Sequence, residues 1–125
     1  RIKMNSQEAF DKDKQETFNK VATHLMTQNE KAQDRYGCLY RTEDGKTCAV
    51  GCLIPKDIYD ERMEHTDLDS ILKNFPELTN IIQPQLDLLT ALQKIHDNVD
   101  VELWPNHLVD LATLEDLEVP AILKK

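Results

Sequence analysis

The clearest hydrophobic pattern in the chain is a helical spacing of apolar residues between positions 18 and 26. Its members recur three or four residues apart and would share one helix face: Phe18, Val21, Ala22, Leu25 and Met26. Asp13 followed by Glu16 three residues later fits a capping box. The pattern predicts a helix from residue 13 to about residue 29, with residues 5–12 adding only a loose preceding turn.

Proline and capping signals predict two helices in the middle of the chain. Pro55 suits the first turn of a short helix that runs through about Met63. Thr66 and Asp69 fit a second capping box, which opens a helix that ends at Pro76.

Two more helices are expected in the last third of the chain. Pro84 begins the longest apolar helix, whose stripe consists of Leu88, Leu89, Leu92, Ile95 and Val99. Pro105 opens a last helix, which carries Leu108, Leu111 and Ala112. From Val119 onward the tail is expected to be extended.

The segment 38–50 predicts a β-hairpin, because two short apolar runs flank the turn Glu43-Asp44-Gly45. A two-residue loop would place Cys38 and Cys48 on opposite faces. A three-residue loop with its glycine in the left-handed conformation pairs Tyr40 with Cys48 and Cys38 with Val50. We favour the three-residue loop because it gathers these four side chains on one face.

Together these elements predict an α+β fold, in which about five helices pack around one β-hairpin at about residues 38–50. We expect a single domain over residues 13–118. We expect residues 1–12 to be a flexible segment, or a remainder of cloning at residues 1–3, and residues 119–125 to be a tail.

Charge changes the range of expected partners. The chain has 125 residues and a formal net charge of −8. Residues 1–59 hold ten basic and nine acidic side chains, whereas residues 60–125 hold five and fourteen. This balance argues against direct binding to nucleic acid or to an anionic membrane surface and permits a protein partner with a basic patch. No apolar run is long enough to span a membrane and no export signal begins the chain, so we expect a cytoplasmic protein.

The three cysteines have the spacing C-x9-C-x3-C, which lacks the paired ligands typical of structural zinc sites. A set of Cys38, Cys48, Cys52 and His65 is conceivable, but buried free cysteines are common in protein cores. We therefore expect no metal, no cofactor and reduced thiols.

Histidines provide the remaining candidate chemistry. Cys48 with His96 and Asp97 is the candidate catalytic set, although no oxyanion-loop signature accompanies it. His96 lies at the edge of an apolar helical stripe and is expected to be buried. Its predicted hydrogen-bond partners are Tyr40 or Cys48 on the hairpin, so that it would link the long apolar helix to the hairpin. Trp104 is expected to anchor the last helix.

The hairpin sequence resembles a family of small proteins of unknown function from bacteriophages, prophages and bacteria. The matching run is Cys38-Leu39-Tyr40-Arg41, Asp44-Gly45, then Cys48-Ala49-Val50-Gly51-Cys52-Leu53-Ile54-Pro55 and Tyr59-Asp60. The similarity spans about residues 14–105 and includes Leu92-Gln93-x-Ile95-His96-Asp97. It implies a phage or bacterial accessory protein, in the host cytoplasm if phage-encoded, and carries over no activity. The polar residues that match are His24, Tyr40, Arg41, Cys48, His96 and Asp97.

The sequence favours a binding protein over an enzyme. The leading hypothesis is a small accessory protein that binds another protein, such as a host or defence factor with a basic patch; an acidic DNA mimic is one variant. The alternatives are a small enzyme or metal protein that uses cysteine and histidine, and a binder of a nucleotide-type signal. His24, Tyr40 and Arg41 are the candidate binding residues. A homo-oligomer is left open.

Overall fold

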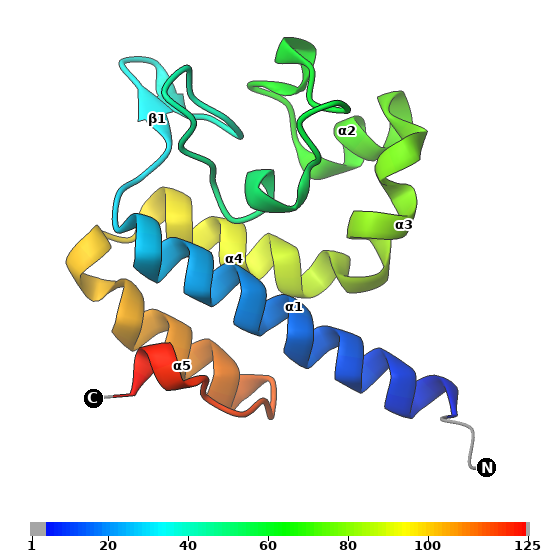
Figure 1. Cartoon of the computed structure of the whole chain (residues 1–125), viewed down its shortest axis with the longest axis vertical. Coiled ribbons are helices and arrows are strands. Elements are labelled where there is room, and N and C mark those ends of the chain that lie inside the picture. Colours follow the sequence, from blue (N-terminus) through cyan, green and yellow to red (C-terminus); the bar gives the residue numbers. More distant parts are fainter. Residues whose placement is uncertain (1–4, 125) are drawn as a thin grey trace.

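The computed structural model describes residues 5–124, which form an α+β fold with one β-hairpin as predicted (Figure 1). In this range the α-helices are α1 Ser6–Gln28, α2 Leu68–Asn74, α3 Thr79–Ile82, α4 Leu86–Asn98 and α5 Trp104–Leu114. The sheet pairs β1 Gln33–Asp34 with β2 Gly37–Cys38 in antiparallel orientation. Residues 1–3, the predicted cloning remainder, lie outside the described residues.

Helices α1, α4 and α5 contact one another and supply most of the core. In Figure 1 the hairpin and α2 lie on one side of α1, and α5 with the C-terminal turn lies on the other. The predicted apolar faces are buried: Phe18, Val21, Ala22 and Leu25 on α1, Leu88, Leu89, Leu92 and Ile95 on α4, and Leu108, Leu111 and Ala112 on α5. Trp104 is fully buried and donates its indole N–H to the carbonyl of Val99 at 3.0 Å. None of the helices within residues 5–124 has both the length and the apolar composition that crossing a bilayer would require.

Helix α1 begins seven residues before the predicted start at Asp13. The side chain of Asn5 accepts a hydrogen bond from the N–H of Glu8 at 2.8 Å and donates to its carboxylate at 2.7 Å, and these two bonds cap the helix ahead of the predicted start. Asp13 lies inside the helix, where its carboxylate accepts a hydrogen bond from Gln85 at 3.0 Å. Residues 5–12 therefore do not form a loose turn: residue 5 caps the helix and residues 6–12 belong to it.

The hairpin turn has the predicted three-residue loop, but the strand pairing differs. Gly45 has φ +90°, the Cys48 N–H donates to the carbonyl of Tyr40 at 3.3 Å, and Arg41 pairs with Thr47 in an isolated bridge. Pairing stops there, because the chain turns at Cys48 into a buried 3-10 turn. Cys38 pairs with residue 33 instead of with residue 50, so the regular sheet lies over residues 33–38.

The predicted helix from Pro55 to Met63 is wrong. The Pro55 carbonyl closes a single turn, and a 3-10 turn follows at Glu61–Met63. Asp60 caps that turn by accepting the N–H of Arg62 at 2.8 Å. Such a local side-chain hydrogen bond competes with helix formation, which accounts for the difference.

The boundaries of the later helices are close to their predictions. Asp67, one residue after the predicted cap, accepts the N–H of Ser70 at 2.8 Å and begins α2, which ends before Pro76. A 3-10 turn that contains Pro84 precedes α4, and Pro105 lies in the first turn of α5.

The prediction of an extended C-terminal tail is wrong for part of the tail. Ala121–Leu123 form a 3-10 turn that contacts α1 and α5, and Leu123 is buried. Burial of its apolar side chain favours this docked turn over an exposed strand.

Candidate functional site

A polar cluster lies at the C-terminal end of α4. His96 is fully buried, and its Nε2 atom accepts the N–H of Ala32 at 3.0 Å. Since a backbone N–H can only donate, Nε2 carries no proton and the proton of the neutral ring lies on Nδ1. Nδ1–H donates to Oδ1 of Asp97 at 2.7 Å. The same oxygen accepts the amide of Gln93 at 2.9 Å, so two donors fix the orientation of the Asp97 carboxylate.

His96 does not bond directly to the predicted hairpin of residues 38–50. Neither Tyr40 nor Cys48 bonds to the imidazole; the backbone of Ala32, just before β1, does. The carbonyl of Ala32 accepts the N–H of Leu39 at 2.8 Å, so the link to that segment is indirect. A backbone N–H leaves no trace in the residue pattern, so sequence could not have identified Ala32.

Cys38, and not Cys48, lies beside His96 and Asp97. The three ligand atoms of Cys38, His96 and Asp97 all lie within 4.8 Å of one another. Cys48 is fully buried, and its sulfur accepts the N–H of Gly51 at 3.2 Å. The catalytic set proposed from the sequence is therefore not assembled around Cys48.

The electrostatics of the cysteines disfavour an activated nucleophile. Burial, and then the charge and hydrogen bonding of Asp97, raise the pKa of Cys38 to about 11. Burial raises the pKa of Cys48 to about 12 and that of Cys52 to about 11. A nucleophilic cysteine requires the opposite shift, because the thiolate is the reactive form.

The same cluster does not fit a metal ion. A metal bound at Nδ1 of His96 would displace the proton that Asp97 accepts. The proton would then have to move to Nε2, where it would face the N–H of Ala32, or leave the ring altogether. The hydrogen bond from Ala32 therefore favours the proton-bearing form of Nδ1, which cannot coordinate a metal.

We expect the thiols of the folded protein to react slowly with iodoacetamide at pH 8. All three cysteines are free, and their raised pKa values keep the thiolate fraction well below that of an ordinary cysteine. For half-buried Cys38 the rate should rise as the pH increases toward 11, and urea should release all three thiols. Mass spectrometry of alkylated peptides measures each site. Rapid labelling of Cys38 near neutral pH in the folded protein would contradict this assignment.

His24 holds the hairpin against α1. Its Nε2 atom lies 3.0 Å from the carbonyl oxygen and 2.9 Å from the hydroxyl of Thr47, and Gln28 exchanges two hydrogen bonds with the Thr47 backbone. The bonds to Thr47 explain why the His24 side chain is half-buried, and they identify it as a structural contact.

Glu64 accepts hydrogen bonds from the backbone of Tyr40 and Arg41. One carboxylate oxygen of Glu64 accepts the N–H of Tyr40 at 2.8 Å, and the other accepts the N–H of Arg41 at 3.1 Å and the hydroxyl of Tyr59 at 2.6 Å. The Arg41 guanidinium donates to the carbonyl of Ile54 at 3.2 Å and lies over the Tyr59 ring. Arg41 thus clamps the hairpin to the following loop.

Two adjoining hollows form a cleft between α2 and α4, which we call the α2–α4 cleft. The outer hollow has a volume of about 500 Å³ and the inner one about 110 Å³. Both are lined by Tyr40, Thr66, Gln93 and Asp97. The outer hollow adds Asp67, Leu68, Asp69, Leu86, Asp87, Thr90 and Lys94, and the inner one adds Cys38, Leu39 and His65.

Carboxylates dominate the charge of the α2–α4 cleft. Asp67, Asp69, Asp87 and Asp97 line it, and the only lysine or arginine among its lining residues is the exposed Lys94. The carboxylate of Asp97 is 34% exposed at the point where the two hollows meet. A cationic group is therefore favoured in the cleft by Coulomb attraction.

The hydroxyl donors of the α2–α4 cleft are used within the protein. Tyr40 donates its hydroxyl proton to the carbonyl of Thr66 at 2.8 Å, and Thr66 donates to Met63 at 2.6 Å. Thr90 donates to the carbonyl of Leu86 at 2.8 Å. One N–H of the Gln93 amide donates to Asp97, which leaves the second N–H of Gln93, the ring of His65 and the ammonium of Lys94 as side-chain donors. The cleft therefore presents mainly acceptors.

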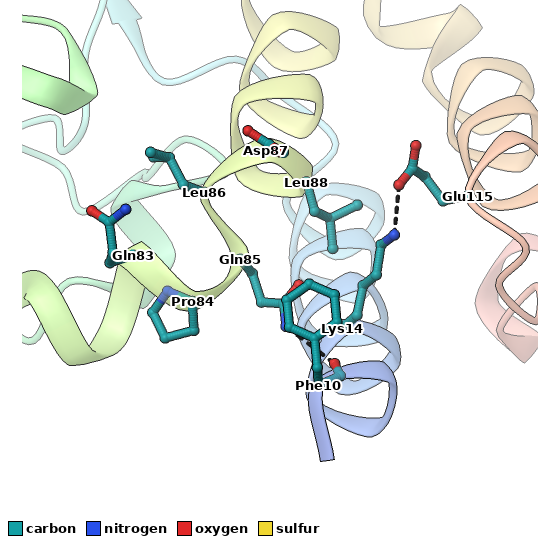
Figure 2. Close-up of a pocket in the computed structure, with 9 residues that line it drawn as sticks. All are labelled: Phe10, Lys14, Gln83, Pro84, Gln85, Leu86, Asp87, Leu88 and Glu115. Carbon is teal, nitrogen blue, oxygen red and sulfur yellow. Dashed lines mark hydrogen bonds and ion pairs between the residues drawn. The ribbon is translucent and has the colours of Figure 1, made fainter. Parts of the chain in front are cut away.

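Two other hollows match a ligand less well. One of about 290 Å³ lies between α1 and the start of α4, where Lys14 pairs with Glu115 at 2.7 Å and Gln85 donates to the carbonyl of Phe10 at 3.2 Å (Figure 2). Another of about 660 Å³ lies beside Glu64, whose carboxylate already accepts three donors. In the first hollow Lys14 and Glu115 neutralise each other. In the second the Glu64 carboxylate is used by internal donors, and the buried Nε of Arg41 is a polar atom there without a hydrogen-bond partner among residues 5–124.

Comparisons with known proteins add no assignment: no family model matches the chain, and no curated protein or solved structure matches it significantly. The resemblance to phage and bacterial proteins stays a prediction.

Proposed function

We propose that this is a small accessory protein that binds another protein and receives a basic segment of that partner in the α2–α4 cleft. The observation that carries the proposal is the acceptor character of the cleft: four carboxylates line it, while its hydroxyl donors are used internally. A binding group must therefore supply both the donors and the positive charge.

Charge supports a protein partner over a nucleic acid. Residues 60–125, which include α2 and α4, hold fourteen acidic and five basic side chains. Phosphate groups would be repelled by this region, whereas lysine or arginine side chains would be attracted. The resemblance to phage and bacterial proteins suggests a host or defence factor as the partner.

The alternative of a nucleotide-type ligand has weaker support. Arg41 and Tyr40 were its candidate residues, but the Arg41 guanidinium bonds to Ile54 outside the α2–α4 cleft. Tyr40 faces a cleft lined by carboxylates, which disfavours an anionic phosphate.

A lysine-rich Gly/Ser peptide should bind the protein and shift the amide resonances of α4 residues 86–97 and of residues 66–69 in NMR spectra. The affinity should fall by roughly tenfold between low salt and about 0.5 M salt, since added ions screen the attraction. A glutamate-rich peptide and duplex DNA serve as negative controls. Tight DNA binding, or peptide-induced shifts confined to other surfaces, would contradict the proposed function.

A further inference from the structure

We infer, on the basis of the function proposed above, that the partner side chain seated in the α2–α4 cleft is arginine rather than lysine. The preference arises at the inner end of the cleft, where a small hollow meets the Asp97 carboxylate. Two properties of that end distinguish the two cations: the arrangement of its acceptors and its partial burial.

The acceptors at the inner end belong to different parts of the chain, Tyr40 after β2 and Asp97 on α4. Tyr40 keeps the lone pairs of its hydroxyl oxygen after donating its proton to the carbonyl of Thr66. Asp97 accepts the donors of His96 and Gln93 on Oδ1, so neither of them occupies Oδ2. A guanidinium has five N–H donors in one plane and can bond to several such oxygens together. An ammonium offers three donors from a single nitrogen.

Partial burial of the inner end also favours arginine. The volume there is only about 110 Å³, and a cation that enters it loses much of its hydration. A guanidinium is hydrated more weakly than an ammonium, so this transfer costs it less free energy. The rigid fork of the guanidinium also loses less conformational freedom for each hydrogen bond formed.

The test uses labelled Gly/Ser peptides that carry arginine, lysine or citrulline at the same positions, with binding to the full chain followed by fluorescence anisotropy. We expect the arginine peptide to bind about tenfold more tightly than the lysine peptide, which corresponds to one additional charge-assisted hydrogen bond. The neutral citrulline peptide should bind more weakly than either. Equal affinity for arginine and lysine overturns this inference and leaves the proposed function standing. Failure of both basic peptides to bind overturns both.

Variants locate the preference at Asp97. Asp97→Asn keeps an acceptor for His96 and Gln93 but removes the negative charge, so the difference between arginine and lysine should vanish. Asp110→Asn makes the same charge change at an exposed position of α5 outside the cleft and should retain the preference. Asp87→Asn at the outer rim should weaken the binding of both peptides equally and keep the ratio of their affinities. A preference that persists in Asp97→Asn would overturn the assignment, even if that variant is less stable than the parent.

Discussion

Replacing Gly51 by alanine is expected to destabilise the protein by about 3 kcal/mol or more, because the added methyl group has no space. A Cβ atom at this position would lie 1.9 Å from the carbonyl oxygen of Tyr40 and 2.8 Å from its carbonyl carbon. Both are backbone atoms that cannot rotate away. The same Tyr40 oxygen accepts the N–H of Cys48, so moving either segment disturbs the hairpin. Urea unfolding followed by circular dichroism measures the loss.

Gly45→Ala is the matched comparison for this prediction. Gly45 has φ +90° but nothing within 4 Å of its missing Cβ, so alanine there meets only the cost of the left-handed conformation, about 1–2 kcal/mol. Gly51 has no positive φ and should nevertheless be the more sensitive site. An unchanged urea midpoint in Gly51→Ala would show that the close approach between the two backbone segments does not exist.

Helices with periodic apolar residues were predicted correctly from the sequence. Elements that depend on polar contacts were predicted at the wrong positions. The stripe of α4 is buried as its spacing predicted. The first turns of α1 lack such a stripe and form by capping at Asn5 and by the side-chain bond between Gln7 and Asp11. The helix start was predicted at Asp13 because the apolar stripe begins soon after that capping signal.

The hairpin shows where local pattern and tertiary packing differ. The turn residues determine the loop, and Gly45 adopts the left-handed conformation that the sequence predicted. Beyond Cys48 the apolar side chains of Ala49 and Val50 are fully buried in the core. Burying them there competes with strand pairing, and Cys38 pairs instead with the nearby residue 33 across the turn at residues 35–36.

The candidate cleft was only partly predictable. Tyr40 and Asp97 were singled out from sequence, and both line the α2–α4 cleft. Their shared environment depends on how α2 packs against α4, which no local spacing specifies. The role of Gln93 in orienting Asp97 depends on a helical i,i+4 contact that becomes meaningful only once the other partners are placed.

The second large effect is expected at His96, where alanine should lower the free energy of unfolding by about 3–5 kcal/mol. The substitution removes a fully buried ring whose centroid lies 5.6 Å from the centroid of the Trp104 ring. Its loss leaves a cavity in the core. It also leaves the buried N–H of Ala32 without its acceptor and frees the Asp97 carboxylate.

His96→Phe separates these two contributions, because it fills most of the space and keeps neither hydrogen bond. Its expected loss of about 1–3 kcal/mol reports the cost of the two lost hydrogen bonds without that of the cavity. His107→Ala removes an exposed histidine of α5 and should change stability by less than about 0.5 kcal/mol. If His96→Phe unfolds at the same urea concentration as the parent, the hydrogen bond from Ala32 does not stabilise the fold. That bond would then not hold the proton of His96 on Nδ1, and Nδ1 could coordinate a metal together with Cys38 and Asp97.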